Sequence, residues 1–439
     1  MSLLRRQFLS LLAATPALAM NSSQAAETAP AGMAHVPWSR HAAIYQVNVR
    51  QYSAEGTLKA AMADLPRLKA MGVDILWLMP LQPIGKLERK GTLGSYYSIR
   101  DYTAVNPEFG TLADARAYVA AAHSLGMKVI LDWVANHTAF DHPWTHEHKD
   151  WYKLDARGEI FPVTFNAGKP GEEHWSDVTA LDYASPALCD AMIAAMQFWV
   201  RETDLDGFRC DVASLVPTPF WERARRELDA VKPMFMLAEA ETPELHRAAF
   251  DMTYSWDLAN LFHRVGKGDA GAAALRDWVA KEPHGYPASA YRMRFTTNHD
   301  FNSWNGTDAE LYGDAWLPLA VLTFTLPGMP LIYNGQESRL TKRLEFFEKD
   351  AIAWKTYELQ PFYSTLLSLK HKHPALGNGQ YGGALALVDV GNDQLFAFRR
   401  SLGADSVTVV VNVTKSAQAF KLGRAERSLP AAGWLVEAA

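Results

Sequence analysis

Short apolar runs and longer stretches with helical spacing alternate along most of this chain. Runs of mainly apolar, β-favouring residues predict eight strands, at 43–49, 75–79, 128–132, 207–211, 234–238, 251–254, 293–297 and 331–334. Between many of them, apolar residues recur at i, i+3 and i+4, which predicts helices such as 58–71, 113–125, 185–203 and 220–230. Alternating strands and helices indicate a parallel sheet, and eight such units over roughly 300 residues predict an α/β fold, a closed (β/α)8 TIM barrel.

Two segments depart from this alternation. Residues 138–184 contain no clear crossover helix and many aromatic, His, Asp and Pro residues, so we interpret them as an insertion after the third strand that walls the cleft. From 375 to 439 the pattern predicts a small C-terminal antiparallel β-sandwich domain, with a hairpin around Gly391-Asn392-Asp393. The catalytic barrel is therefore expected to occupy 35–137 and 185–374.

Residues 1–25 have the pattern of an export signal peptide. Arg5 and Arg6 precede an almost entirely apolar run at 9–19, and small residues suited to cleavage follow. The arginine pair is typical of a twin-arginine signal, with an ordinary secretory signal as the alternative. Because the apolar run is too short for a stable bilayer span, we expect a periplasmic or secreted protein with no membrane anchor after processing.

The composition of the chain suits a soluble protein and argues against some classes of binding partner. Hydrophobic residues make up 49% of the chain and charged residues 21%, which suits a soluble protein with a large core. The formal net charge is −5, and the absence of a basic patch in the sequence argues against nucleic acid as a partner. The sequence has two cysteines, Cys189 and Cys210. Since Cys210 lies on the strand face opposite Arg209 and Asp211, we expect both cysteines to be buried free thiols.

Charged side chains follow the ends of several predicted strands, where the active sites of such barrels lie. They are Asp132, Arg209, Asp211, Glu239 and Asp300. Side-chain alternation directs Arg209 and Asp211 together toward the barrel mouth. Such a set can break a glycosidic bond with retention of configuration, which needs a nucleophilic carboxylate and a proton donor roughly 5–5.5 Å apart.

The sequence around two of these carboxylates predicts different protonation. Arg209 favours the ionised form of Asp211, as a nucleophile requires. Glu239 has apolar neighbours and no adjacent cation in the sequence. Desolvation and nearby anions are therefore expected to raise the pKa of Glu239, so that it holds the proton for the leaving group.

Several motifs occur in an order that resembles one enzyme family. They are Asp132-x-x-x-Asn136-His137, Gly207-Phe208-Arg209-x-Asp211, Glu239 and Asn298-His299-Asp300, with Gly94-Ser95-Tyr96-Tyr97 and the stretch from Gly328 to Glu337 in support. Together they resemble glycoside hydrolase family 13, the α-amylase family, over most of the chain. The resemblance implies that Asp211 is the nucleophile, Glu239 the acid and base, and Asp300 the group that stabilises the distorted sugar ring.

The same resemblance implies roles for four substrate-binding residues. Arg209 orients Asp211, His137 and His299 contact the sugar at the cleavage subsite, and Tyr97 stacks under that sugar ring. Tyr96 is the weaker choice for the stacking residue. Asp132 is expected to bond Arg209 rather than substrate.

Simpler interpretations exist for each residue alone. Arg209 and Asp211 could be a structural ion pair, Asp300 could cap a helix, and His137 could be a core histidine. Three carboxylates could also bind a metal. Convergence on one rim of the barrel favours the catalytic interpretation.

A calcium site is weakly supported. Many family members have an Asp-rich calcium loop after the first strand and a Lys-His pair after the nucleophile, but residues 50–57 and 212–216 contain neither. Asn136 and Asp177 are two candidate ligands, which do not make a site. We therefore expect no metal and no cofactor, calcium being possible but without a clear ligand set.

The sequence thus predicts a retaining α-glucan hydrolase that cleaves α-1,4-glucosidic bonds in malto-oligosaccharides or starch fragments by double displacement. The missing Lys-His pair weakens the case for an ordinary endo-acting starch amylase. An α-glucanotransferase or a disaccharide isomerase on the same scaffold is the alternative, and a non-catalytic sugar-binding protein is a further one.

Overall fold

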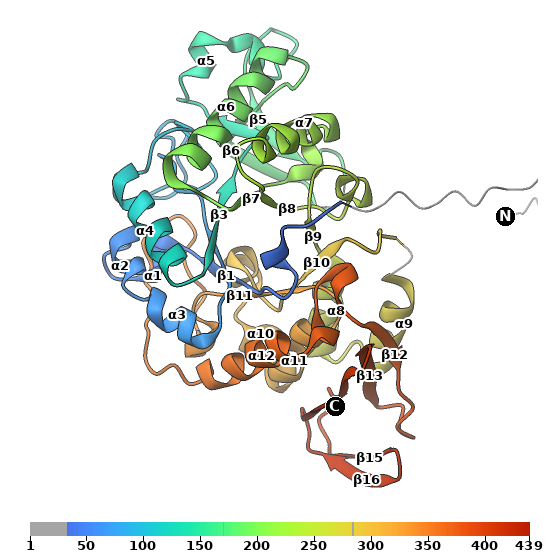
Figure 1. The fold of residues 1–439 in the computed structure, drawn as a ribbon. Helices are drawn as coiled ribbons and strands as arrows, with labels where there is room; N and C mark the ends of the chain where they lie inside the picture. Colours follow the sequence, from blue (N-terminus) through green and yellow to red (C-terminus); the bar gives the residue numbers. More distant parts are fainter. Residues whose placement is uncertain (1–32, 170, 283–284) are drawn as a thin grey trace, which may run out of the picture. The chain divides into compact units, whose positions relative to one another are not determined.

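The structure, a computed structural model, describes residues 33–169, 171–282 and 285–439. The predicted signal peptide, 1–25, lies outside the described residues. Within them, eight parallel strands close a barrel in the order β1-β11-β10-β9-β8-β7-β3-β2 (Figure 1). Their bounds are β1 Ile44–Val47, β2 Ile75–Leu78, β3 Lys128–Trp133, β7 Gly207–Cys210, β8 Phe235–Ala238, β9 Met252–Tyr254, β10 Tyr291–Arg294 and β11 Met329–Tyr333. The predicted barrel is confirmed.

Helices surround these strands in Figure 1. They are α1 Val49–Tyr52, α2 Leu58–Met62, α3 Leu65–Met71, α4 Leu112–Ser124, α6 Pro186–Thr203, α7 Thr218–Asp229, α8 Trp256–Lys267, α9 Ala272–Lys281, α10 Asp308–Tyr312, α11 Trp316–Thr325 and α12 Gln360–Lys372. The helix predicted at 58–71 is divided in two. Pro66 lies in the first turn of α3, where its missing N–H is tolerated, and so it marks the start of a new helix.

One strand lies earlier than the sequence suggested. The prediction placed it at 293–297, but the paired strand β10 is Tyr291–Arg294. Its pairing with β11 involves Met293 and Arg294. The segment that leads to Asp300 is therefore an unpaired connection at the barrel mouth.

Alternating residues of the strands form two separate apolar layers. Ile130, Phe235 and Leu237 belong to the cluster inside the barrel, whereas Phe208 and Cys210 belong to the cluster between strands and helices. Because side chains alternate along a strand, the residues in phase with the inner set point into the barrel. This phase directs Asp132, Arg209 and Glu239 inward at the ends of their strands.

Gly207 allows β7 and β8 to pair closely. A Cβ atom added there would lie 1.9 Å from the Phe235 carbonyl oxygen, so any side chain would push the strands apart. Since β7 carries Arg209 and Glu239 follows β8, this contact helps to set the distance between those two side chains.

The insertion and the C-terminal region are built from antiparallel strands. In the insertion, β4 His137–Ala139 and β5 Pro162–Phe165 flank β6 Glu173–Ala180, with the short α5 Trp144–Glu147. The C-terminal region has a sheet β12-β13-β14-β17 and a separate pair of strands, β15 and β16. Their bounds are β12 Ala384–Leu387, β13 Leu395–Leu402, β14 Asp405–Asn412, β15 Gln418–Leu422, β16 Ala425–Leu429 and β17 Trp434–Ala438.

The hairpin predicted around residues 391–393 is confirmed, with Leu387 paired to Phe398. Strands β15 and β16 were not predicted, because half of their residues are polar and they bury chiefly Phe420 and Leu429. Both cysteines are free thiols; Cys210 is buried, but Cys189 is partly exposed, so the expectation that both are buried was wrong. Across residues 33–439, leaving aside 170 and 283–284, no helix combines the length and apolarity that a bilayer crossing requires.

Candidate active site

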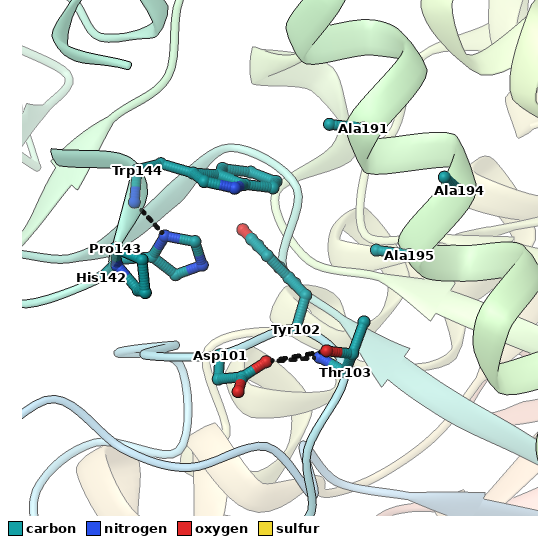
Figure 2. Close-up of a pocket in the computed structure, with 9 residues that line it drawn as sticks. All are labelled: Asp101, Tyr102, Thr103, His142, Pro143, Trp144, Ala191, Ala194 and Ala195. Carbon is teal, nitrogen blue, oxygen red and sulfur yellow. Dashed lines mark hydrogen bonds between the residues drawn. The ribbon is translucent and has the colours of Figure 1, made fainter. Parts of the chain in front are cut away.

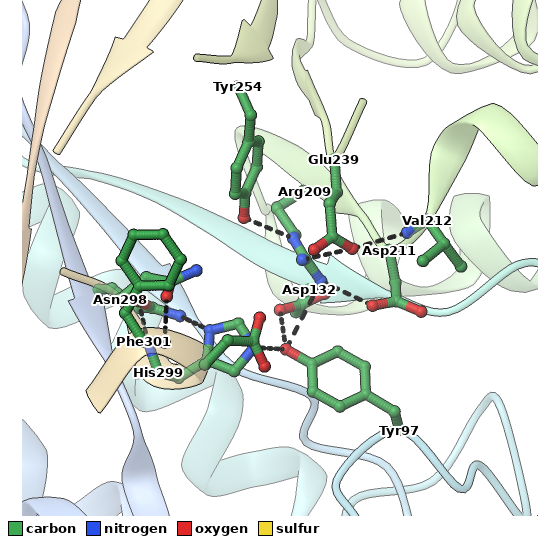
Figure 3. A network of polar contacts seen from close by, with 12 residues as sticks. Tyr97, Asp132, Arg209, Asp211, Val212, Glu239, Tyr254, Asn298, His299 and Phe301 are labelled. Carbon is green, nitrogen blue, oxygen red and sulfur yellow. Dashed lines mark hydrogen bonds and ion pairs between the residues drawn. The ribbon is translucent and has the colours of Figure 1, made fainter. Parts of the chain in front are cut away.

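Arg209 is the centre of a buried polar network at the barrel mouth (Figure 3). Its side chain is fully buried. The guanidinium Nη1 lies 2.8 Å from Asp132 Oδ1 and 3.0 Å from Asp211 Oδ1, and Nη2 lies 2.8 Å from Glu239 Oε2. Its Nε donates to the Tyr254 hydroxyl at 3.2 Å. One arginine therefore binds three carboxylates, and the expected contact between Asp132 and Arg209 is confirmed.

A chain of hydrogen bonds fixes the orientation of His299. The backbone N–H of His299 donates to Gln46 Oε1, which turns the Gln46 amide nitrogen toward His299 Nδ1 at 2.7 Å. His299 Nδ1 then accepts, so Nε2 carries the proton and donates to Tyr97 Oη at 2.7 Å. The Tyr97 hydroxyl in turn donates to Asp132 Oδ2 at 3.1 Å. Burial, together with the Arg209 charge, keeps the pKa of His299 well below its usual value, which agrees with this neutral tautomer.

Glu239 is held by a cation and by the backbone. Its Oε2 accepts from the Val212 N–H at 2.8 Å and lies beside Arg209 Nη2. In the fold Glu239 therefore has a cation beside it, although none is adjacent in the sequence. Arg209 lies in β7 and Glu239 follows β8, so their contact arises from strand pairing, which the local sequence does not show.

The turn after Asp211 is strained. Val212 has φ 36° and ψ 45°, a left-handed conformation that β-branched residues rarely adopt. This conformation aims the Val212 N–H at Glu239. We infer that the strain is maintained because it keeps Glu239 beside Asp211.

Burial and mutual repulsion make it unfavourable for all the carboxylates of the site to be ionised at once. Burial first, and then the charge of Glu239, raise the pKa of Asp211 well above its ordinary value, although Arg209 acts in the opposite direction. Arg209 favours the ionised form of Asp211, as expected, but burial and the Glu239 charge outweigh this effect. Burial also raises the pKa of Asp132 to about 6.

Asp300 is the more accessible acid of the site, with a side chain 33% exposed. It does not cap the following turn: Asn298 Oδ1 accepts the Phe301 N–H at 2.8 Å, and Asp300 makes no side-chain cap bond. Its Oδ2 lies 3.2 Å from His299 Nε2. Burial of the ionised form and the charge of Glu239 raise the pKa of Asp300 to about 7. The capping interpretation is therefore wrong.

His137 lies apart from the Arg209 network. Its imidazole is buried, which lowers its pKa to about 4, and it faces the Tyr97 backbone. The ring is 5.6 Å from that of Trp175 on β6. Tyr96 is also buried and packs against the Arg50 guanidinium, 4.1 Å from the ring centroid. This position excludes Tyr96 from the mouth and leaves Tyr97 as the partly exposed ring beside Asp132.

Comparison with known proteins identifies the family. The family model for the alpha-amylase catalytic domain matches residues 21–361. The chain belongs to the alpha-amylase family. It is 31% identical to an alpha-amylase from Lactobacillus plantarum whose crystal structure superposes with a TM-score of 0.82, covering 92% of this chain and 99% of that one.

Two curated members of the alpha-amylase family are longer than this chain. One is an alpha-amylase from Haloarcula japonica, 28% identical over 395 residues, which cover 85% of this chain and 56% of the relative. Another is an alpha-1,4-glucan:maltose-1-phosphate maltosyltransferase from Rhodospirillum rubrum, also 28% identical, with 86% of this chain and 58% of the relative covered. The chain thus spans a little over half the length of both proteins.

Three residues of this alpha-amylase family site were missed by the sequence analysis. Gln46 on β1 holds His299, Tyr254 on β9 holds Arg209, and Trp77 on β2 donates from Nε1 to Asp132 Oδ2 at 3.1 Å. A polar residue inside an otherwise apolar strand was a usable signal for Gln46. In the sequence, Trp77 and Tyr254 cannot be distinguished from ordinary aromatic residues of the core.

Both candidate calcium ligands contact other side chains. Asp177 Oδ1 lies 3.0 Å from Lys90 Nζ, so an ammonium group ties the insertion to the loop after β2. Asn136 contacts His137 through its amide at 3.2 Å. Among the residues with described positions, no group of three or more His, Cys, Asp or Glu side chains is arranged to hold a metal ion.

A cavity of about 320 Å³ lies between the insertion and α6 (Figure 2). Trp144, His142 and Asp101 line one side, and Ala191, Ala194 and Ala195 of α6 line the other. None of its lining residues belongs to the Arg209 network. The cavity is therefore separate from the candidate active site.

The repulsion among these acids predicts that Asp300→Asn makes the protein more stable. Between pH 3.8 and about 7 the folded protein keeps a proton on Asp300 that the unfolded chain has released. Folding therefore becomes less favourable as the pH rises through this window. Asparagine removes that penalty, and after allowance for solvent screening we expect the unfolding free energy at pH 8 to increase by about 1 kcal/mol.

Urea unfolding at pH 5 and pH 8 measures this effect. The gain should be larger at pH 8, and Asp277→Asn, at an exposed position on α9, is the matched control. An equal effect of Asp300→Asn at both pH values would contradict the proposed repulsion.

Proposed function

We propose that this protein is a retaining α-glucan hydrolase that cleaves α-1,4-glucosidic bonds in malto-oligosaccharides or starch fragments. The observation that carries the proposal is the shared guanidinium of Arg209, which holds Asp211 and Glu239 on its two terminal nitrogens. Membership of the alpha-amylase family supports the substrate class. The proposed roles of individual residues are those that the family resemblance implies, and the contacts of the network support them.

Asp211 is the proposed nucleophile. Its carboxylate oxygen attacks the anomeric carbon, the bond to the glycosidic oxygen breaks, and the electron pair of that bond passes to the leaving oxygen. Glu239 donates a proton to this oxygen. In the second step Glu239 removes a proton from water, the water oxygen bonds to the anomeric carbon, and Asp211 is released. Two inversions at one carbon give net retention.

The mechanism requires that Glu239 carries a proton while Asp211 is ionised. Asp211 and Glu239 share one arginine inside a cluster of four carboxylates, of which Asp132 and Asp300 are the other two. The state that reacts is the one with the proton on Glu239 and the negative charge on Asp211. The hydrogen bond from Val212 to Glu239 Oε2 leaves Oε1 to carry the proton toward substrate.

Four further side chains are proposed to bind the sugar at the cleavage point. Asp300, with its partly exposed carboxylate, accepts hydrogen bonds from sugar hydroxyls. His299 is held neutral by its partners, and its Nε2–H, which donates to the Tyr97 hydroxyl in the structure, is proposed to pass to a sugar hydroxyl when substrate binds. Tyr97 offers a ring for stacking, and His137 lies beside the Tyr97 backbone as a further donor.

Glu239→Gln tests the proposed acid. The amide keeps the hydrogen bonding of the site but cannot donate the proton, so we expect kcat on maltoheptaose to fall by about a thousandfold while the sugar still binds. The fall in kcat/KM should be smaller for p-nitrophenyl maltosides, whose leaving group needs less protonation. The anomeric configuration of the first product, followed by NMR, tests retention.

Glu241→Gln is the matched control. This glutamate lies two residues further along and pairs with Arg292 at 2.9 Å. Its loss should leave turnover close to that of the wild type. Undiminished hydrolysis by Glu239→Gln would exclude its role as the acid.

A transferase is the second candidate function. One relative of similar identity is named as a maltosyltransferase, and the same covalent intermediate can be captured by a sugar hydroxyl in place of water. The products formed from maltoheptaose at high maltose concentration separate the two: chains longer than the substrate indicate transfer. Export to the periplasm or medium is a further part of the proposal, supported by the pattern of residues 1–25.

A further inference from the structure

Trp304 exposes more of its side chain than the other large apolar residues at the barrel mouth. Its relative exposure is 56%, and it follows Asp300 by four positions in the short π-helical turn Phe301–Asn305. A large aromatic side chain left in water is costly, and exposed apolar surface beside a cleft commonly marks a binding site. Trp304 has no part in the hydrolytic steps described above.

The ring of Trp304 ends a row of aromatic side chains that begins in the catalytic network. The Tyr97 and Phe346 rings are nearly parallel, with centroids 6.3 Å apart and planes at 18°. Phe346 then lies 5.2 Å from Trp304, and Phe347 lies 5.8 Å from Trp304. The row therefore runs without interruption from the partly buried Tyr97 to the exposed Trp304.

The backbone that carries Trp304 is fixed to the segment that carries Phe346. Asn302 Nδ2 donates to the Lys342 carbonyl at 3.1 Å, and Asn302 Oδ1 accepts the Leu344 N–H at 2.9 Å. Ser303 Oγ donates to the Leu344 carbonyl at 2.8 Å. Because these bonds tie the Trp304 turn to the segment that precedes Phe346, they fix the backbone on which both rings stand before any ligand binds.

Core packing accounts for part of the row. Phe346 and Phe347 are half-buried and contact one another at 5.2 Å, as core aromatics do. Packing does not account for Trp304, because more than half of its side chain faces water. A ring that is held rigidly and yet exposed is suited to stacking against the apolar face of a sugar.

We propose that Trp304, supported by Phe346 and Phe347, is a binding platform for the glucosyl units next to the one that is bonded to Asp211. The proposal rests on the α-glucan hydrolase function proposed above. The ligand proposed for this platform is a glucan chain, because the row of rings is continuous with Tyr97. A chain that places one glucosyl unit on Tyr97 can place its next units along the row.

The direction of the chain follows from the two sides of the site. The row joins the network at Tyr97 and His299, whose ring lies 6.4 Å from Phe346. Glu239, which protonates the leaving oxygen, is held by Arg209 and Val212. The leaving part of the glucan therefore departs on the Glu239 side. The platform binds the glycone part, toward the non-reducing end.

Trp304→Ala and Trp304→Phe test the platform. Hydrolysis is measured on maltoheptaose and on p-nitrophenyl α-glucoside, which reaches only the cleavage subsite. For the alanine variant we expect the ratio of kcat/KM on the long substrate to that on the short one to fall about tenfold, with most of the loss in KM. The phenylalanine variant, which keeps a ring, should recover much of that ratio.

The control variant is Tyr357→Ala, an aromatic residue 37% exposed that packs on the Arg67 guanidinium and not on the row. Equal losses of kcat/KM on both substrates, or no loss on either, would contradict the proposed platform.

Calorimetric binding of maltoheptaose to each variant is measured separately from hydrolysis. Failure of the wild type to hydrolyse while binding still depends on Trp304 would reject the proposed hydrolase but keep the platform. Binding unaffected by Trp304→Ala would reject the platform alone.

Discussion

Replacing Asp211 with asparagine is expected to lower kcat on maltoheptaose by on the order of a hundred-thousandfold, because the amide cannot form the bond to the anomeric carbon that the proposed nucleophile makes. The amide is nearly isosteric and neutral. The folded state should therefore be at least as stable as the wild type near neutral pH, since burial and the Glu239 charge already oppose ionisation of Asp211. Loss of activity with a retained or higher melting temperature is the expected pair of results.

Asp308→Asn is the matched control for this change. Asp308 is also a buried carboxylate, but it accepts from Thr296 Oγ1 at 2.7 Å and from Gln336 Nε2, outside the Arg209 network. Burial raises the pKa of Asp308 to about 7, so an uncharged amide there is a mild substitution. Mass spectrometry of the wild type trapped with a fluorinated glucosyl donor should locate the label on Asp211. A label on another residue would reject Asp211 as the nucleophile.

Replacing Arg209 with methionine is expected to destabilise the fold and abolish activity. The guanidinium is fully buried and is the cation that contacts Asp132, Asp211 and Glu239. Removing one partner of a buried ion pair leaves uncompensated charge, so we expect the unfolding free energy to fall by about 3–5 kcal/mol. Chemical denaturation followed by tryptophan fluorescence measures the change.

The pH dependence of that loss identifies its cause. Without Arg209 the carboxylates keep their protons to higher pH in the folded state, so folded protein binds more protons than unfolded protein above the ordinary carboxylate range. Stability then falls as the pH rises, and the deficit of Arg209→Met should be larger at pH 8 than at pH 5. Arg209→Lys keeps the charge but cannot reach three acceptors through a rigid fork, so it should recover part of the stability and little activity. A deficit independent of pH would indicate lost packing instead of unpaired charge.

Much of the fold was predictable because it depends on local periodicity. The apolar runs at 75–79 and 207–211 became β2 and β7, and the side-chain phase of β7 was correct, with Cys210 outside the barrel and Arg209 inside. The order of motifs also predicted the family. Local signals failed where pairing decided the outcome, as in β10, and where burial is slight, as in β15 and β16.

Protonation in the site was not predictable from neighbours in the sequence. Glu239 has apolar residues on either side along the chain, yet Arg209 from the adjacent strand lies 2.8 Å away. Asp211 has that arginine two positions before it, yet burial and Glu239 outweigh the arginine. Electrostatic energies depend on distance and dielectric surroundings, and both are set by strands that are far apart in sequence.

The sequence by itself determined the eight strands and the acidic residues that follow several of them, because strand phase and motif spacing are properties of the chain. Tertiary structure alone decided which acids share Arg209, that Asn298 relieves Asp300 of a capping role, and that Trp304 stands at the end of an aromatic row. The sharing of Arg209 and the aromatic row join segments that are far apart in the chain, whereas the cap is a choice between two nearby side chains, Asn298 and Asp300, that the sequence leaves open.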